Sequence, residues 1–222
     1  MKEFQTEAFT AERVWEVEGI PALTAEVSLP RPEPLSDRVS RRIHRYYQAQ
    51  CRAFLRYCES WLLPQAAAEY QAALASSGPL PEFKAELSYQ VTYQQDGLWS
   101  LYTQSKEDTG PGPVFVTRRG DTWDLREGYP VPLRDFFPKG MGWKKRLLSL
   151  AAEEIDRRTR AGMGQYHPEW RQALRRHFNP QNYYLTEEGL AFFYPMYALA
   201  PASQGISVFL LPYGEEAPHR CV

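Results

Sequence analysis

The sequence predicts an α+β protein in which two or three helices pack on one face of an antiparallel sheet. Three observations carry this prediction. Short runs that alternate apolar and polar residues occur near the start, in the middle and near the end of the chain, as expected of half-buried strands. Two long stretches repeat apolar residues at helical spacing. Turn signals join neighbouring strands, which favours hairpins and antiparallel pairing.

The chain begins with a predicted hairpin. Residues 13–17 and 22–29 alternate in polarity on either side of Gly19-Ile20-Pro21, where glycine and proline favour a turn. Prolines at positions 30, 32 and 34 follow, and each lacks a backbone N–H donor. We therefore expect the sheet to end at Leu29 and an extended connector to follow it.

A long amphipathic helix is predicted after the prolines. Ser36 is the expected N-cap, because its hydroxyl can accept a hydrogen bond from the first helical turn. Pro64 is expected to kink or end this helix, and a second helical piece covers residues 65–75. The apolar residues that form the predicted inner stripe are Val39, Ile43, Tyr46, Tyr47, Phe54, Cys58, Trp61 and Leu62.

Two further hairpins are predicted in the middle of the chain. The first joins residues 85–93 to 98–104 through Asp96-Gly97, a dipeptide typical of two-residue hairpin turns. The second joins residues 114–117 to 122–125, with Gly120 in the expected turn at 118–121.

The last third of the chain predicts a helical region followed by a small sheet. In the helix 143–160, Glu153 and Glu154 precede Arg157 and Arg158 by four residues, the favourable order for surface ion pairs. Gly189 is expected to take a positive φ in a hairpin turn. The other predicted elements are a helical turn at 132–137, a helix at 169–177, and strands at 182–185, 190–194 and 206–211.

The chain is predicted to form a single α+β domain over residues 1–222. A length of 222 residues is long for one domain and short for two, and no interior linker separates two self-sufficient cores. Within this domain we distinguish an N-terminal part, residues 10–105, and a C-terminal part, residues 112–214.

The composition narrows the classes of function. The formal net charge is −1, from 26 basic and 27 acidic residues. This argues against a nucleic-acid partner, since such proteins carry strongly basic surfaces. No apolar run approaches the roughly 18 residues that cross a bilayer, and the first residues show no secretory-signal pattern. We expect a cytoplasmic protein if the chain naturally begins at Met1, and an extracytoplasmic one if a leading segment has been removed.

No motif in the sequence predicts catalysis. Phosphate-binding glycine loops are absent, and the four histidines lack standard metal-ligand spacing. No catalytic residue, metal ion or cofactor is therefore predicted. Asp121 with Asp124, or Glu153 with Glu154, would supply the carboxylate pair of a glycan-acting enzyme, but turn positions and a solvated helix face are the favoured explanation of these residues.

Three short motifs follow one another near the C-terminus. They are Asn182-Tyr183-Tyr184-Leu185-Thr186 with Gly189-Leu190, then Tyr197-Ala198-Leu199-Ala200-Pro201 with Gly205, then Leu211-Pro212-Tyr213. This block resembles the family catalogued as domain of unknown function 3298. Residues 122–137 are similar to the segment that precedes the block in that family. The N-terminal part resembles an associated module catalogued as 4163.

The resemblance implies a binding function. Relatives include outer domains of membrane-anchored anti-sigma factors, one type of which senses lysozyme, and domains beside cell-wall polysaccharide deacetylases. It implies a non-catalytic binding or sensing module for a protein or glycan ligand, related to lysozyme or to the bacterial cell wall. The loop at 194–204 is the predicted contact region, with Tyr183, Tyr194, Tyr197 and Pro201 as predicted binding residues.

The start of the long helix offers a second hypothesis. Arg38, Arg41, Arg42 and Arg45 form a basic face there. A cytosolic regulatory protein would dock an acidic partner through Arg41 and Arg45, with an affinity that falls as salt screens the charges. A solvated helix face whose arginines pair with nearby acids explains the same pattern. The oligomeric state is left open.

Overall fold

The computed structural model describes residues 5–214. The chain forms two compact units that interleave along the sequence: one takes the residues up to Tyr89 with Thr103–Phe115, the other Gln90–Tyr102 and the residues from Val116 onward. The three boundaries fall inside strands, namely β3 (Phe83–Gln95), β4 (Leu98–Asp108) and the first residues of β5 (Phe115–Asp124). The single domain with parts 10–105 and 112–214 stays a prediction.

The first unit opens with the predicted hairpin, which is longer than expected. β1 (Gln5–Val17) and β2 (Ile20–Glu33) pair antiparallel along their whole length, with a bulge between Trp15 and Glu16. Glu18 and Gly19 connect them, and both have positive φ, as a tight two-residue hairpin turn requires. The turn therefore begins one residue earlier than predicted, and Ile20 and Pro21 belong to β2. Local turn chemistry therefore sets the register of this hairpin.

The prediction that the prolines end the sheet at Leu29 is wrong. β2 continues to Glu33, and Pro30 and Pro32 both pair with β1. On its other side β2 pairs with β3 only over Leu23–Val27. Beyond Val27 that side of β2 has no strand partner among the described residues. Proline is tolerated on such an edge, because its missing N–H removes no ladder hydrogen bond.

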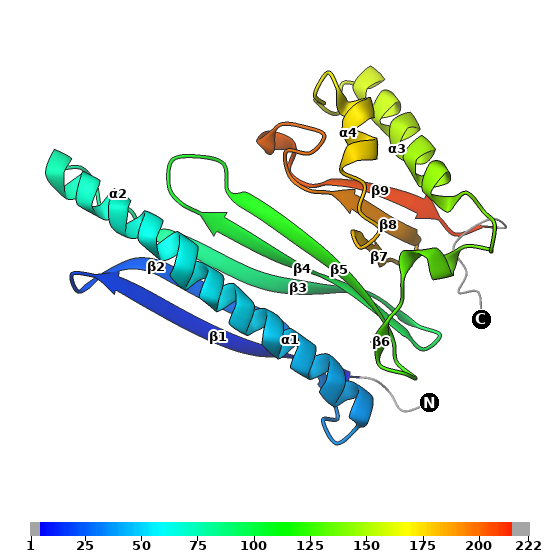
Figure 1. The fold of residues 1–222 in the computed structure, drawn as a ribbon, viewed down its shortest axis with the longest axis horizontal. Helices are drawn as coiled ribbons and strands as arrows, with labels where there is room; N and C mark the ends of the chain where they lie inside the picture. Colours follow the sequence, from blue (N-terminus) through cyan, green and yellow to red (C-terminus); the bar gives the residue numbers. More distant parts are fainter. Residues whose placement is uncertain (1–4, 215–222) are drawn as a thin grey trace. The chain divides into compact units, whose positions relative to one another are not determined.

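The long helix follows, with a corrected start. α1 (Arg38–Tyr57) is capped by Asp37 rather than Ser36, and the Asp37 carboxylate accepts a hydrogen bond from the Ser40 N–H at 2.9 Å. The helix then continues through a π-helical turn, η1 (Cys58–Leu62), into α2 (Leu63–Ser76). Figure 1 shows the three as one long ribbon. The wider hydrogen-bond spacing of η1 accommodates the missing donor of Pro64.

The π turn also changes which residues face the sheet. Cys58 and Leu62 are both buried, whereas Trp61 is 72% exposed, although its spacing predicted an inward position. A π turn holds more residues than an α turn, because its hydrogen bonds run from i to i+5. The extra residue rotates Trp61 away from the core.

The helices connect two strands that lie side by side. β2 and β3 are parallel neighbours, so the predicted antiparallel sheet is mixed at this pair. A parallel pair needs a long crossover, and α1–η1–α2 supplies it. α1 and α2 pack against β2. The fully buried residues of the first unit include Leu23, Leu29, Ile43, Tyr47 and Phe83.

Of the two hairpins predicted in the middle of the chain, one forms and the other does not. The β3–β4 hairpin forms as predicted, with positive φ at Asp96 and Gly97. The turn predicted at 118–121 is wrong, because β5 (Phe115–Asp124) runs through it as one strand. A Cβ on Gly120 would lie 1.8 Å from the Tyr183 carbonyl oxygen, so this glycine permits close backbone approach rather than a turn. Hydrogen bonds link these strands in the order β1-β2-β3-β4-β5-β6, where β6 is Tyr129–Pro130.

A small antiparallel sheet organises the second unit. It contains β7 (Tyr183–Leu185), β8 (Gly189–Tyr194) and β9 (Ser207–Pro212), in that order. α3 (Trp143–Arg160), α4 (Trp170–Arg176) and η2 (Leu133–Phe136) pack against one face. The other face packs against Tyr102 of β4, so every residue of β8 is buried. The predicted α+β class is confirmed.

Gly189 has a role other than the predicted one. It begins β8 without a positive φ, and a Cβ there would lie 2.2 Å from the Leu211 carbonyl oxygen. The glycine therefore allows β9 to pass close to β8. Thr186 organises the turn instead, since its hydroxyl accepts hydrogen bonds from the N–H groups of Glu188 and Gly189.

Candidate functional site

Two of the predicted contact residues, Tyr183 and Tyr194, lie in the core of the second unit. They are 4% and 1% exposed. The Tyr183 hydroxyl donates to the Val131 carbonyl, and the Tyr194 hydroxyl donates to the Leu174 carbonyl at 3.0 Å. Burial raises the pKa of both phenols, so both hydroxyls stay protonated donors. These two tyrosines hold the scaffold, and a ligand at the surface does not reach them.

The loop after Tyr194 brings a third predicted residue, Tyr197, to the surface. The Ala198 N–H donates to the Pro195 carbonyl at 3.1 Å and closes a four-residue turn with Tyr197 in its third position. Tyr197 has a φ of 66° and is 49% exposed. Glycine or asparagine normally occupies this turn position, since it needs a positive φ. A tyrosine there costs on the order of 1–3 kcal/mol.

The residues on either side of Tyr197 fix the loop in place. Met196 is 7% exposed, and its sulfur accepts a hydrogen bond from the Val116 N–H of β5 at 3.3 Å. Leu199 is fully buried, and its carbonyl accepts a hydrogen bond from the His167 N–H at 2.9 Å. Because both flanks are held, the surrounding structure can maintain the strained backbone of Tyr197.

Pro201 completes the partly exposed stretch of this loop. It precedes η3 (Ala202–Gln204), which ends at Gly205 with a φ of 62°. Residues 195–206 contain no Asp, Glu, Lys or Arg. A ligand at this loop would therefore meet an aromatic ring, a hydroxyl group and backbone groups rather than charged side chains.

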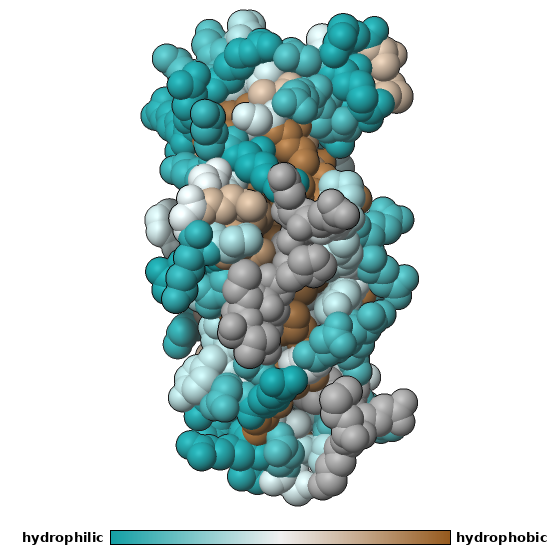
Figure 2. Space-filling view, turned by 90° about the vertical axis from the view of Figure 1, so that its right-hand side faces the viewer, coloured by the Kyte–Doolittle hydropathy of each residue, from teal (hydrophilic) through white to brown (hydrophobic). Residues whose placement is uncertain are grey.

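Other large apolar side chains also reach the surface. On the face shown in Figure 2, hydrophilic residues dominate and hydrophobic residues are visible in small separate areas. Trp61, Met163 and Tyr129 are more exposed than Tyr197, at 72%, 58% and 57%. Exposed apolar side chains are ordinary on protein surfaces. Tyr197 differs from these three in its positive φ.

Arg41 and Arg45 are both exposed on α1 in the first unit. The Arg41 guanidinium donates to the carbonyls of Leu35 and Ser36, at 3.3 and 2.7 Å, and so holds the segment before the helix. The Arg45 guanidinium makes no hydrogen bond or ion pair within residues 5–214. Of the two predicted residues, Arg41 thus has a structural contact and Arg45 faces solvent.

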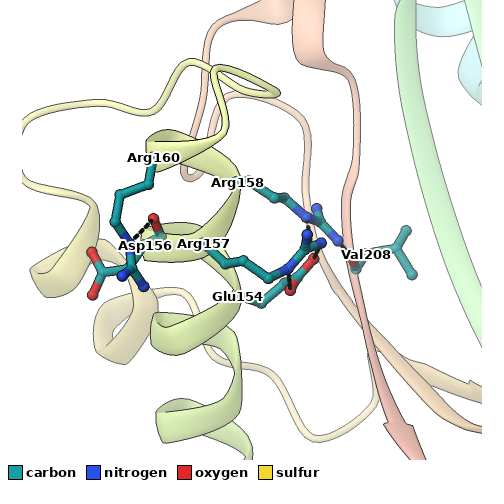
Figure 3. Close-up of polar contacts among 6 residues, drawn as sticks. All are labelled: Glu154, Asp156, Arg157, Arg158, Arg160 and Val208. Carbon is teal, nitrogen blue, oxygen red and sulfur yellow. Dashed lines mark hydrogen bonds and ion pairs between the residues drawn. The ribbon is translucent and has the colours of Figure 1, made fainter.

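Glu154, one of the carboxylates considered for catalysis, forms ion pairs with neighbouring arginines instead. It accepts hydrogen bonds from Arg157 at 2.7 Å and from Arg158 at 2.6 Å, as Figure 3 shows. These bonds, from Arg157 and then Arg158, lower the Glu154 pKa to about 2. Arg157 thus pairs with Glu154 rather than with Glu153, the partner that spacing favoured. A carboxyl group ionised at such low pH cannot act as a general acid near neutrality.

Asp121 and Asp124, the other proposed pair, are also engaged locally. Both are 6% exposed. Asp121 pairs with Arg119 at 3.3 Å, and Asp124 accepts a hydrogen bond from the Arg126 N–H at 2.8 Å. These contacts fix the end of β5 and the turn after it.

A buried carboxyl group in the first unit was missed by sequence reasoning. Glu107 of β4 is 8% exposed and accepts a hydrogen bond from the Tyr57 hydroxyl at 2.9 Å. Burial raises the Glu107 pKa, and burial with the bond to Glu107 raises the Tyr57 pKa to about 12. Strand alternation puts Glu107 on the same side as Thr103 and Ser105, but such polar residues do not suggest an inward face.

No metal centre is formed by the part of the chain that the structure describes. Its histidine, cysteine, aspartate and glutamate side chains nowhere gather in a group of three or more suited to a metal ion. Over the same residues, no helix is long and apolar enough to cross a membrane.

The architecture defines the class of protein, an α+β fold that recurs in two crystal structures. A DUF3298 family member from Bacteroides fragilis NCTC 9343 is 16% identical and has a TM-score of 0.69, with 95% of this chain and 90% of that chain covered. A DUF3298 family protein from Pseudomonas aeruginosa PAO1 is 18% identical and has a TM-score of 0.59, with 96% and 92% covered. At these identities the likeness shows a shared fold.

The family model agrees with the structural likeness. Residues 134–214 match the model of the family described as protein of unknown function DUF3298, so the resemblance of the C-terminal block is confirmed. The matched region includes the three strands of the small sheet and the loop that carries Tyr197. The resemblance of the N-terminal part to a 4163-type module stays a prediction. A search of curated proteins found no match.

Proposed function

We propose that this protein is a non-catalytic binding or sensing module, and that the loop around Tyr197 is its contact surface for a protein or glycan ligand. The observation that carries this proposal is the positive φ of an exposed tyrosine whose flanking residues are anchored. Glycine would form the same turn without strain. Strained residues cluster at ligand contacts, where the side chain is needed despite its cost.

The ligand class follows from the resemblance and from the chemistry of the loop. DUF3298-like relatives imply a partner related to lysozyme or to the bacterial cell wall. A tyrosine ring can pack on a sugar face or fill a pocket of a protein partner, with its hydroxyl hydrogen-bonded at the rim. Because residues 195–206 carry no charged side chain, binding through this loop should depend weakly on salt.

Calorimetric titration with two probes tests the proposal: hen egg-white lysozyme, and soluble fragments of purified peptidoglycan. Tyr197→Gly removes both the ring and the backbone strain. We expect this variant to gain about 1 kcal/mol of unfolding free energy and to bind the active probe at least tenfold more weakly. A Tyr197→Ala/Pro201→Ala double variant should lose affinity too.

A matched control comes from the first unit. Trp61→Ala also removes an exposed aromatic ring and should leave the affinity within twofold. Full affinity of Tyr197→Gly would show that this loop is not the contact surface. Failure of the wild-type protein to bind either probe would contradict the proposed ligand class.

A further inference from the structure

The exposed side of α1 carries a single row of arginines. The five residues that form this row are exposed, and we call them the arginine stripe: Arg38, Arg41, Arg45, Arg52 and Arg56. At 3.6 residues per turn they fall within about 60° of arc and extend over about 27 Å. The buried side of α1, which includes Ile43 and Tyr47, is centred about 150° away around the helix.

Few acidic groups balance the positive charge of the arginine stripe within residues 5–214. α1 contains no Asp or Glu, and the guanidinium groups of Arg38, Arg45, Arg52 and Arg56 make no hydrogen bond or ion pair within residues 5–214. The pairing with nearby acids that would make this an ordinary solvated face is therefore not seen for these four. Like charges spaced along one helix face repel one another and destabilise the helix.

We infer that the arginine stripe is a docking surface for an acidic α-helix of a partner protein. This surface belongs to the first unit, whereas the Tyr197 loop belongs to the second unit. The guanidinium group presents a planar fork of donors that fits a carboxylate bidentately, which a lysine cannot match. The stripe contains no lysine.

The spacing of the stripe favours a helix as the occupant. Arg38, Arg45 and Arg52 are seven residues apart, or about 10.5 Å along the helix axis. Carboxylates at seven-residue intervals on a partner helix recur at the same distance, so the charges stay in register when two helices lie side by side.

Other anionic occupants fit the stripe less well. Helices that lie on membranes present large apolar side chains beside their basic residues. Between Arg45 and Arg52 the residues that flank the stripe are Gln48 and Ala49, and neither is large and apolar. A flexible polyanion does not require one narrow row with a fixed helical repeat, because any cluster of positive charge attracts it.

The test uses fluorescent helical peptides of 25 residues and the whole protein. One peptide carries its glutamates in a single stripe at the spacing of the arginines, and a second peptide of identical composition distributes them around the helix. Fluorescence anisotropy should show at least tenfold tighter binding of the striped peptide. Its affinity should fall as salt is raised from 50 to 300 mM.

Paired charge-reversal variants locate the contact. Arg45→Glu/Arg52→Glu should weaken binding of the striped peptide at least tenfold. Arg175→Glu/Arg176→Glu makes the same charge change at exposed positions of α4 and should alter binding less than twofold. Circular dichroism should show unchanged helix content in both variants.

Three results would overturn the inference. Equal binding of the two peptides would show that the protein attracts any acidic peptide non-specifically. Equal losses in the two paired variants would place the contact elsewhere. Tighter binding of heparin or of vesicles with anionic lipids than of the striped peptide would assign the stripe to a polyanion or a membrane surface.

Discussion

In each unit a helix packs against a strand, α1 against β4 in the first and α3 against β9 in the second, but the side chains at the two interfaces differ in kind. Between α1 and β4, polar groups are enclosed: the Gln50 amide donates to the Thr103 hydroxyl at 2.7 Å, and Tyr57 donates to Glu107. Between α3 and β9, apolar and aromatic residues fill the interior. There the polar contacts lie at the rim, where Arg158 bonds both Glu154 and the Val208 carbonyl.

The comparison shows that the surroundings of a glutamate decide whether its ionised form stabilises or destabilises the fold. Glu107 is removed from water with one hydroxyl donor, and its pKa is raised. Glu154 keeps solvent contact beside two guanidinium groups, and its pKa falls to about 2. The first environment penalises the ionised form, and the second stabilises it. The two interfaces should therefore respond to pH in opposite directions.

The largest expected effect tests the close packing of the second unit. Gly120→Ala places a Cβ 1.8 Å from the Tyr183 carbonyl oxygen, so β5 and β7 must separate. We expect a loss of about 3–5 kcal/mol in unfolding free energy, measured by urea denaturation. Gly112→Ala is the control, since nothing lies within 4 Å of its Cβ position, and it should change stability by less than about 0.5 kcal/mol. Similar effects of the two variants would contradict tight β5–β7 packing.

A smaller effect tests the enclosed carboxyl group of the first unit. The folded-state pKa of Glu107 is raised above 4.5, so its stabilising contribution is complete below pH 4.5 and is lost as pH rises through the folded-state pKa. Glu107→Gln keeps an acceptor for Tyr57 but cannot ionise. We expect this variant to be more stable than wild type by about 1 kcal/mol at pH 8, and the difference to disappear near pH 4. Thermal unfolding across this pH range measures it, and a destabilised variant at pH 8 would refute the assignment.

The smallest effect concerns the ion pair at the edge of the α3–β9 interface, where the change in stability has the opposite sign to that of Glu107→Gln. The folded-state pKa of Glu154 is lowered from 4.5 to about 2, so its contribution is present above pH 4.5 and is lost as pH falls toward 2. Glu154→Gln should be less stable than wild type by about 0.5–1 kcal/mol at pH 7, since the pair is partly solvated. The same pH series shows whether the two proteins converge near pH 2. Glu153→Gln is the matched control, because Arg157 and Arg158 bond Glu154 instead, and it should change stability less.

Sequence reasoning succeeded where local chemistry decides the structure. Asp96-Gly97 needs only its own backbone preferences to form a tight turn, and the turn at Gly19 forms within one residue of its predicted place. The apolar spacing of residues 143–160 predicted α3 with the bounds that the structure shows. At the candidate site, the family-like block singled out Tyr197 and Pro201, but its tyrosines were treated alike. Tyr183 and Tyr194 are buried and Tyr197 is exposed, a difference set by which strands pack around them.

By itself the sequence determined the α+β class, the hairpins with tight turns and the main helices, because these depend on contacts between residues close in the chain. It also determined the family-like C-terminal block, which is identified from its motifs. Only the tertiary structure decided the roles of Gly120, Gly189 and Glu107, because each depends on a strand or helix distant in sequence. It also decided that Tyr197 is displayed with a positive φ, since anchors from β5 and from His167 hold its loop. Long-range packing thus decides which of several similar tyrosines is exposed at the surface.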